Sequence, residues 1–170
     1  MKDRTQAPDP VPVDFPPHPG SVTPDQTVDV MVFPQPDPNN AHQLVVTFQP
    51  VGPQPTNWPD PEYLYVMSSG ITLFNLYLDN ASSYVFFGKG VTLSSDTPTP
   101  DLNYYFNPYF DPRISTKHVA FMAQYIGDNW AHVDPILLFI KDPTHPLLFS
   151  EPTDPDILNP GDHPKLTSGG

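Results

Sequence analysis

The sequence predicts an all-β fold: a single-domain antiparallel β-sandwich of the immunoglobulin-like or jelly-roll type. The first observation is a series of roughly seven to nine short strand-like segments separated by turn signals. The second is a content of 26 prolines, which break helices and are kept out of central strands. The third is that no segment has the pattern of a convincing long helix.

The dipeptide Asp-Pro recurs between the predicted strands. Asp favours a turn by bonding nearby backbone, and the Pro that follows blocks both a helix and a ladder bond. We therefore interpret these dipeptides as the turns that separate strands. They begin at Asp9, Asp37, Asp60, Asp111, Asp134, Asp142 and Asp154.

The segment Gly70–Leu93 is expected to form the centre of the fold. It lies within the longest proline-free span, residues 62–97, and central strands need their backbone donors. Two apolar, aromatic runs flank a polar turn at Asp79–Ser83. Gly88-Lys89-Gly90 interrupts the second run, and glycines inside a strand pattern indicate a bulge or a sharp bend.

Three shorter strands are expected before this centre. The first two alternate apolar and polar residues, which is typical of strands with one buried face. In the second of them, Leu44, Val46 and Phe48 point inward and Val45 points outward. The expected ranges are Thr27–Phe33, Gln43–Gln49 and Glu62–Met67, with breaks at Pro34–Asn40 and Pro50–Pro61.

The segment Ser115–Asn129 is compatible with a helix or a strand. As a helix, it has a cap candidate in Ser115, good helix formers in its middle and Gly127 near its end. We favour the strand, because Gly127-Asp128-Asn129 would then turn it into the β-rich run Trp130–Ile140 and complete a hairpin. His145–Phe149 is a candidate for one more edge strand.

The prolines divide the chain into three parts. Residues 1–26 are expected to form an extended, proline-rich arm, either as a mobile tail or packed on its own domain or a neighbouring subunit. Residues 27–150 form the predicted sandwich. Residues 151–170, rich in Pro, Asp and Gly, are expected to fray.

The charge balance bears on partners. The chain has 19 acidic and 7 basic residues, a net charge of −12, so nucleic acids and anionic membranes are disfavoured. There is no Cys, which excludes disulfides, thiolate metal sites and Cys nucleophiles. Without a signal peptide or an apolar span, we expect a cytoplasmic protein, or one exported by an unusual route.

Catalytic and metal-binding motifs are sparse. The six histidines show no ligand spacing, and Gly-x-Ser-x-Gly and phosphate-binding loops are absent. His132 and Asp134 share a strand face, and His118 on the predicted hairpin partner could approach them. This constellation would suit a metal-dependent hydrolase. Otherwise we expect no cofactor, no metal and no catalytic residue.

The aromatic loop at residues 103–112, within a predicted loop Ser94–Arg113, is the best candidate binding site. Such rings can cap the sandwich, dock on another subunit, or stack on sugar rings while the intervening Asn and Asp bond hydroxyls. Trp58 is a further candidate for sugar stacking. The candidate residues in the loop are Tyr104, Tyr105, Phe106, Tyr109 and Phe110.

A short part of the chain resembles a known family. Val133-Asp134-Pro135-Ile136, with Glu151-Pro152 beyond it, is similar to small bacterial β-sandwich proteins named for Asp-Pro and Glu-Pro motifs. The resemblance implies a β-sandwich of unknown function and carries over no catalytic residue.

The first functional hypothesis is a non-enzymatic β-sandwich that acts by self-association or by binding a protein partner. The alternative is a carbohydrate-binding, lectin-like module that takes a neutral glycan on the aromatic loop. The second alternative is the metal-dependent hydrolase.

Overall fold

A computed structural model describes residues 23–51, 58–66, 70–93, 105–125, 132–145 and 152–159, and it confirms the all-β class. These residues form nine strands and no helix. The strands are β1 (Gln26–Asp37), β2 (Asn40–Val51), β3 (Tyr63–Tyr65), β4 (Ile71–Leu78), β5 (Val85–Leu93), β6 (Tyr105–Tyr109), β7 (His118–Gln124), β8 (His132–Lys141) and β9 (Asp156–Asn159).

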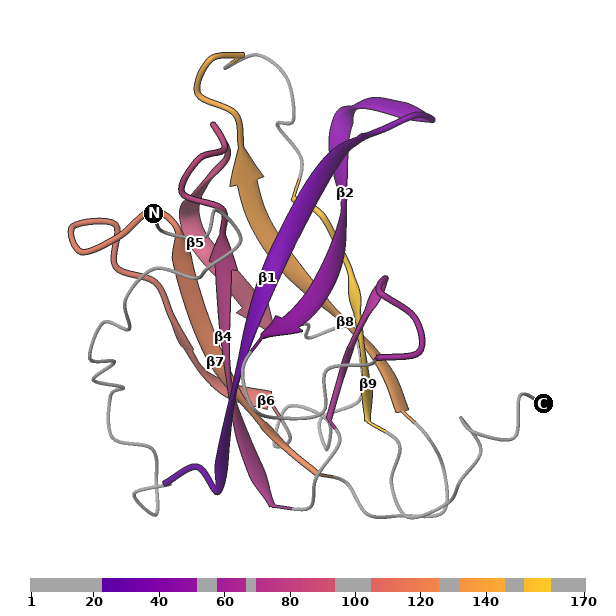
Figure 1. Ribbon diagram of the computed structural model, residues 1–170, viewed down its shortest axis with the longest axis vertical. Helices are drawn as coiled ribbons and strands as arrows, with labels where there is room; N and C mark the ends of the chain where they lie inside the picture. Colours follow the sequence, from indigo (N-terminus) through magenta and orange to yellow (C-terminus); the bar gives the residue numbers. More distant parts are fainter. Residues whose placement is uncertain are drawn as a thin grey trace.

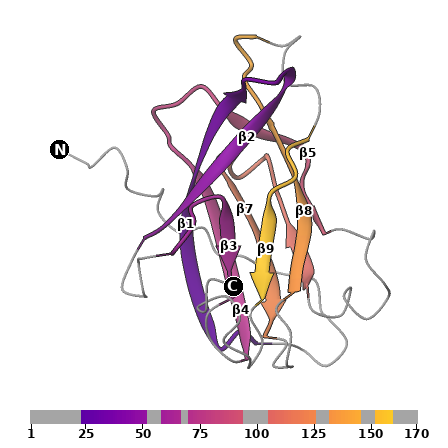
Figure 2. The ribbon, with the colours of Figure 1, turned by 90° about the vertical axis from the view of Figure 1, so that its right-hand side faces the viewer.

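The strands build two mixed sheets (Figures 1 and 2). One has the order β2-β1-β4-β7-β6, and the other has the order β3-β9-β8-β5. Most neighbours are antiparallel as predicted, but β1 with β4 and β3 with β9 are parallel. The prediction of a purely antiparallel arrangement is therefore wrong, because these partners are separated in sequence and meet through connections that no local pattern reveals.

One apolar cluster lies between the two sheets. The alternation predicted from sequence is confirmed, since every second residue of a strand contributes to it. Phe74 and Phe121 stack at its centre with ring centroids 5.3 Å apart. Contributors include Val30, Leu44, Val46, Phe48, Leu76 and Val119 from the first sheet, and Leu64, Phe86, Leu138, Ile140 and Ile157 from the second.

The predicted hairpin of Ser115–Asn129 with Trp130–Ile140 is wrong, although the strand interpretation is right. β7 pairs with β4 and β6, whereas β8 pairs with β5 and β9 in the other sheet. Apolar periodicity identifies which face of a strand is buried but not which strand lies beside it. The proposed turn at residues 127–129 lies outside the described residues.

Two strands occur where none was expected. β6 lies in the segment predicted as the loop Ser94–Arg113, and β9 lies in the tail 151–170 that was expected to fray. β9 is held between β3 and β8, and its Ile157 is fully buried. Composition suggested otherwise because Pro108 lies inside β6 and Pro155 directly precedes β9. Residues 1–22 of the arm and residues 146–149 lie outside the described residues.

β1 and β2 run past their predicted ends, and Pro34 and Pro36 lie inside β1. Backbone N–H groups of alternate residues point to opposite edges of a strand. The backbone nitrogens of Pro34 and Pro36 lie on the edge of β1 that faces β4. The pairing of β1 with β4 ends at Val32. Beyond that point the two prolines remove donors that would have no strand partner, which explains why β1 tolerates them.

The predicted bulge at Gly88–Gly90 is confirmed. The pairing of β5 with β8 shifts register between Phe86 and Val91. Gly88 and Gly90 have φ of 59° and 72°, which side chains disfavour. A Cβ added at Gly90 would lie 2.6 Å from Phe110 Cγ, so this glycine also allows a close approach.

Four of the Asp-Pro dipeptides form the turns that the sequence predicts. In each, the Asp carboxylate accepts a hydrogen bond from the amide two residues ahead, an Asx turn. Asp134, by contrast, lies inside β8. The four donor amides belong to Asn39, Glu62, Arg113 and Thr144, at 2.8, 2.9, 3.0 and 3.0 Å from Asp37, Asp60, Asp111 and Asp142.

Candidate functional site

The first half of the aromatic loop packs into the protein. Tyr105 is 7% exposed and belongs to the shared core, while Phe106, 8% exposed, lies on the opposite face of β6. Neither ring is on the surface, where a sugar would need it. Tyr104 lies outside the described residues.

The second half of the loop also contacts its own domain. The Tyr109 ring is tilted against the His118 ring at 6.0 Å, and the Phe110 ring meets Phe86 edge-on at 6.3 Å. Both Tyr109 and Phe110 are half-buried. This placement favours the interpretation in which the loop covers its own sheets.

Trp58 lies apart from that loop, beside β2. Its ring is 5.6 Å from the Tyr65 ring, and the residue is half-buried against the core. It lines a hollow of about 330 Å³ together with Phe33, Thr47, Phe48, Gln49, Pro50 and Pro61. Trp58 is therefore the sequence-predicted candidate that the structure places at a surface hollow.

The outer edge of β2 pairs with no other strand of the described chain. The amide of Phe48 points away from β1 and donates to the carbonyl oxygen of Pro61, at 2.7 Å. By alternation, the N–H and C=O groups of Leu44 and Val46 also point outward. β2 pairs only with β1, and the described segments supply no backbone partner to these two residues.

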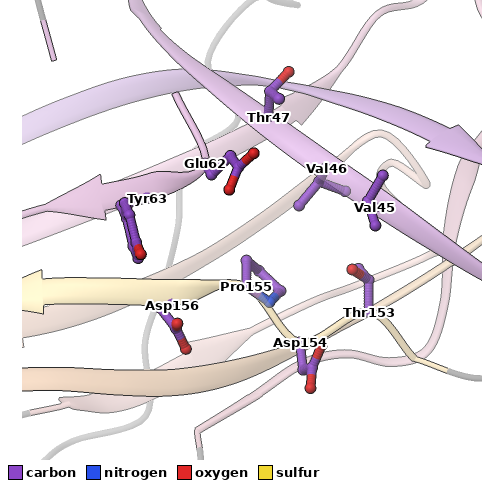
Figure 3. Close-up of a pocket in the computed structure, with 9 residues that line it drawn as sticks. All are labelled: Val45, Val46, Thr47, Glu62, Tyr63, Thr153, Asp154, Pro155 and Asp156. Carbon is purple, nitrogen blue, oxygen red and sulfur yellow. The ribbon is translucent and has the colours of Figure 1, made fainter. Parts of the chain in front are cut away.

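A second hollow of about 290 Å³ lies along this same edge (Figure 3). It separates β2 from the segment that leads into β9. At one end Gln43 Nε2 donates to the carbonyl oxygen of Pro152 at 3.2 Å, and at the other end is the bond between Phe48 and Pro61. Its lining comprises Val45, Val46, Thr47, Glu62, Tyr63, Thr153, Asp154, Pro155 and Asp156.

The second hollow is acidic. Glu62 reaches into the gap between β2 and the segment 153–156. Asp154 and Asp156 lie on that segment, on the side of the gap opposite β2 (Figure 3). Within the described ranges, the carboxylates of Glu62 and Asp154 have no ion-pair or hydrogen-bond partner. No Lys or Arg is among the described residues that line the hollow.

Three of the four described Lys and Arg residues are engaged elsewhere, and the fourth, Lys89, lies exposed on the β5 bulge. Arg113 pairs with Asp111 at 3.0 Å, and Lys117 donates to the carbonyl oxygens of Ser82 and Tyr84. Lys141 Nζ lies 5.2 Å from the centre of the Phe87 ring. None of these three side chains lines the acidic hollow, so none of them neutralises its carboxylates.

The predicted cluster of His118, His132 and Asp134 does not form across a hairpin, because β7 and β8 belong to different sheets. His118 lies on the face of its sheet away from the shared core and is 3% exposed. Its Nε2 is 2.8 Å from Asn75 Oδ1. The side chains of His132 and Asp134 are outside what the structure describes.

A buried polar chain surrounds His118. Asn75 Nδ2 donates to Asp29 Oδ1 at 3.1 Å, so the contact runs from β7 through β4 to β1. The Tyr77 ring stacks on the imidazole at 4.8 Å. Burial lowers the pKa of His118 to about 4, and burial and the Asp29 charge raise the pKa of Tyr77 to about 12.

The described residues bring no three His, Asp or Glu side chains together in a way that could hold a metal ion. They also include no helix long and apolar enough to cross a membrane. No protein-family model, curated protein or solved structure matches this chain. The resemblance at Val133–Ile136 therefore stays a prediction.

Sequence reasoning missed the β2 edge as a site. The alternation of Gln43–Gln49 correctly predicted a strand and placed Val45 on its outer side, and Val45 is 43% exposed. A sequence cannot tell whether a strand lies at the edge of a sheet, because that depends on its neighbours. The acidic residues of the hollow are spread from position 62 to 156, so no local motif joins them.

Proposed function

We propose that this chain is a non-enzymatic β-sandwich protein that acts through protein–protein contact, by self-association or by binding a partner, along the outer edge of β2. One observation carries the proposal. β2 is a long edge strand whose outward N–H and C=O groups at Leu44 and Val46 are unpaired within the described chain. Such an edge is a template for a further strand.

The other sheet edges are protected, which singles out β2. β6 carries Asn107 with φ of 54° and then Pro108, and its register shifts between Phe106 and Tyr109. β5 bears the glycine bulge, and its Phe86 amide donates to Thr116 at 2.8 Å. β3 has three residues only. Bulges, prolines and short length are the usual means of blunting an edge.

Sedimentation velocity of the full chain, alone and with candidate partners, tests the proposal. Val45→Lys places a charge beside the open edge and is expected to weaken association about tenfold or more. Ile114→Lys is the matched control, because Ile114 is a 51% exposed apolar residue in a loop. Its association should equal that of the parent chain.

The opposite result is equally clear. A chain that stays strictly monomeric, is unchanged by removal of residues 1–22 and binds no protein at β2 would overturn the proposal. The deletion stops at residue 22 because the Asp25 carboxylate accepts a hydrogen bond from the backbone amide of Ile71, at 2.7 Å, at the start of β4.

A carbohydrate-binding function is the second candidate, and the hollow beside Trp58 favours it. Indole rings stack on sugars, and Thr47 and Gln49 line the same hollow with groups that bond hydroxyls. A glycan array decides the matter, with Trp58→Phe expected to retain binding and Trp58→Ala to lose it. Absence of any bound glycan rejects this candidate.

A further inference from the structure

We infer that the partner of the β2 edge is an extended peptide segment with a Lys or Arg side chain that enters the acidic hollow. This inference rests on the proposed function and names the chemistry of the partner. It follows from three features of the hollow: the backbone groups on its two sides, its size, and its charge.

Unpaired backbone groups face the hollow from two sides. On the β2 side they belong to Val46, which lines the hollow, and those of Leu44 come next along the same edge. On the opposite side, Thr153 exchanges two backbone hydrogen bonds with Leu138 of β8, so alternation turns the N–H and C=O of Asp154 away from β8 and toward the side of β3. The parallel pairing with β3 begins only at Asp156, which leaves Asp154 beyond its end.

The size of the hollow suits one long side chain. A volume of about 290 Å³ is at the lower limit of small-molecule pockets. The two hydrogen bonds from Gln43 to Pro152 and from Phe48 to Pro61 limit the open stretch of the β2 edge to the residues between them, so only a short extended segment fits there. The partner backbone therefore lies along the β2 edge, and a side chain enters.

The lining selects a cation. Val46, Pro155 and the Tyr63 ring form a wall for an aliphatic stem, and Glu62 and Asp154 offer carboxylates without a partner in the described chain. Lys and Arg pack their stems on apolar surface and give their charge to carboxylates. A second copy of this acidic chain would instead bring like charges to the same edge, at a cost in affinity.

The neighbouring hollow extends the recognition. Thr47 lines both hollows, and the second contains Phe33, Trp58 and Pro61. An extended segment that places its cation beside Glu62 therefore runs past an apolar, aromatic surface. The favoured partner sequence combines a basic residue with a nearby apolar one.

A displayed library of random heptapeptides, selected on the full chain, tests the inference. Lys or Arg should be enriched at one position, next to apolar residues. A selected Arg peptide should bind about tenfold tighter than the same peptide with citrulline, and the difference should shrink at high salt. Glu62→Gln and Asp154→Asn should each remove part of this preference, whereas Ile114→Lys, which changes the net charge as much as either, should not.

Two outcomes overturn the inference alone, and a third overturns the proposed function with it. If peptides without Lys or Arg are selected and Val45→Lys abolishes their binding, the edge binds protein but the cation is wrong. If Arg peptides bind Glu62→Gln and Asp154→Asn as tightly as the parent, the hollow is not their site. If no peptide is selected and the chain neither self-associates nor binds a partner protein at β2, both proposals fail.

Discussion

The amide of Phe48 donates a 2.7 Å hydrogen bond to the carbonyl oxygen of Pro61, and this bond shows which residues of β2 direct their backbone groups away from β1. Because N–H groups alternate along a strand, the bond assigns even-numbered residues of β2 to the outer edge and odd-numbered ones to β1. The same alternation turns the backbone groups of Leu44 and Val46 outward, and Val46 lines the acidic hollow.

Amide hydrogen exchange measures this alternation directly. The amides of Val45 and Thr47, bonded to β1, should exchange about tenfold or more slowly than those of Leu44 and Val46. Phe48 should be protected as well, because its outward amide has a partner. Equal exchange along β2 would mean that the outer edge is covered, and the proposed site would then be closed.

The two glycines of the β5 bulge should differ in their tolerance of Ala. Gly90→Ala puts a Cβ 2.6 Å from Phe110 Cγ and 2.8 Å from Val119 Cγ1 at φ of 72°, so it should destabilise by about 2–4 kcal/mol. Gly88→Ala meets only Phe139 at 3.9 Å, so about 1–2 kcal/mol is expected, from the backbone alone. Urea unfolding of both variants provides the comparison, and equal losses would contradict the packing at Gly90.

The sequence was a good guide to strands and faces and a poor guide to neighbours. Gln43–Gln49 was predicted correctly because period-two alternation reports burial of one face. The parallel contact of β1 with β4 was invisible, since Val30 and Leu76 become neighbours only through tertiary structure. Likewise, alternation along β7 places His118 on the face opposite its apolar residues. The local sequence does not indicate that Asn75 is the hydrogen-bond partner of His118.

Lys117 should be worth more to stability than its partial exposure suggests. Its ammonium donates to the carbonyl oxygens of Ser82 and Tyr84, which connect β4 to β5 across the two sheets. Burial lowers the pKa of Lys117, although Asp79 opposes the shift. Lys117→Met should cost about 1–3 kcal/mol, because two carbonyls lose a charged donor.

Lys89→Met is the matched control for Lys117. Lys89 is exposed on the bulge, so its substitution should change the free energy of unfolding by less than about 0.5 kcal/mol. Thermal unfolding of the two variants separates the contributions. If both behave like the parent chain, the ammonium does not hold the connection between β4 and β5.

His118 should make the stability of the fold depend on pH in a defined window. Burial lowers its folded-state pKa to about 4, from an ordinary value of 6.5. Above pH 6.5 the imidazole is neutral in both states, so its contribution to stability is fully present. As the pH falls below that value, the imidazole is protonated in the unfolded chain but not in the folded one. The free energy of unfolding therefore decreases until the folded imidazole titrates near pH 4.

The size and the location of this loss distinguish it from other titrations. A shift from 6.5 to about 4 corresponds to about 3 kcal/mol over the window. Hydrogen bonds from Thr144 lower the pKa of Asp142 to about 2. The contribution of Asp142 to stability is therefore lost only between about pH 4 and 2, which is below the pH window of His118. Urea unfolding at a series of pH values should therefore show a decline that begins near pH 6.5.

The variant His118→Gln should flatten this decline. Gln can still donate to Asn75 Oδ1 but does not titrate, so the variant should be less stable at neutral pH, through loss of the stack on Tyr77, and nearly independent of pH from 6.5 to 4.5. His42→Gln, at an exposed position of β2, should keep the parental slope. A parental slope in His118→Gln would show that the imidazole is not the buried neutral group that joins β7 to β4.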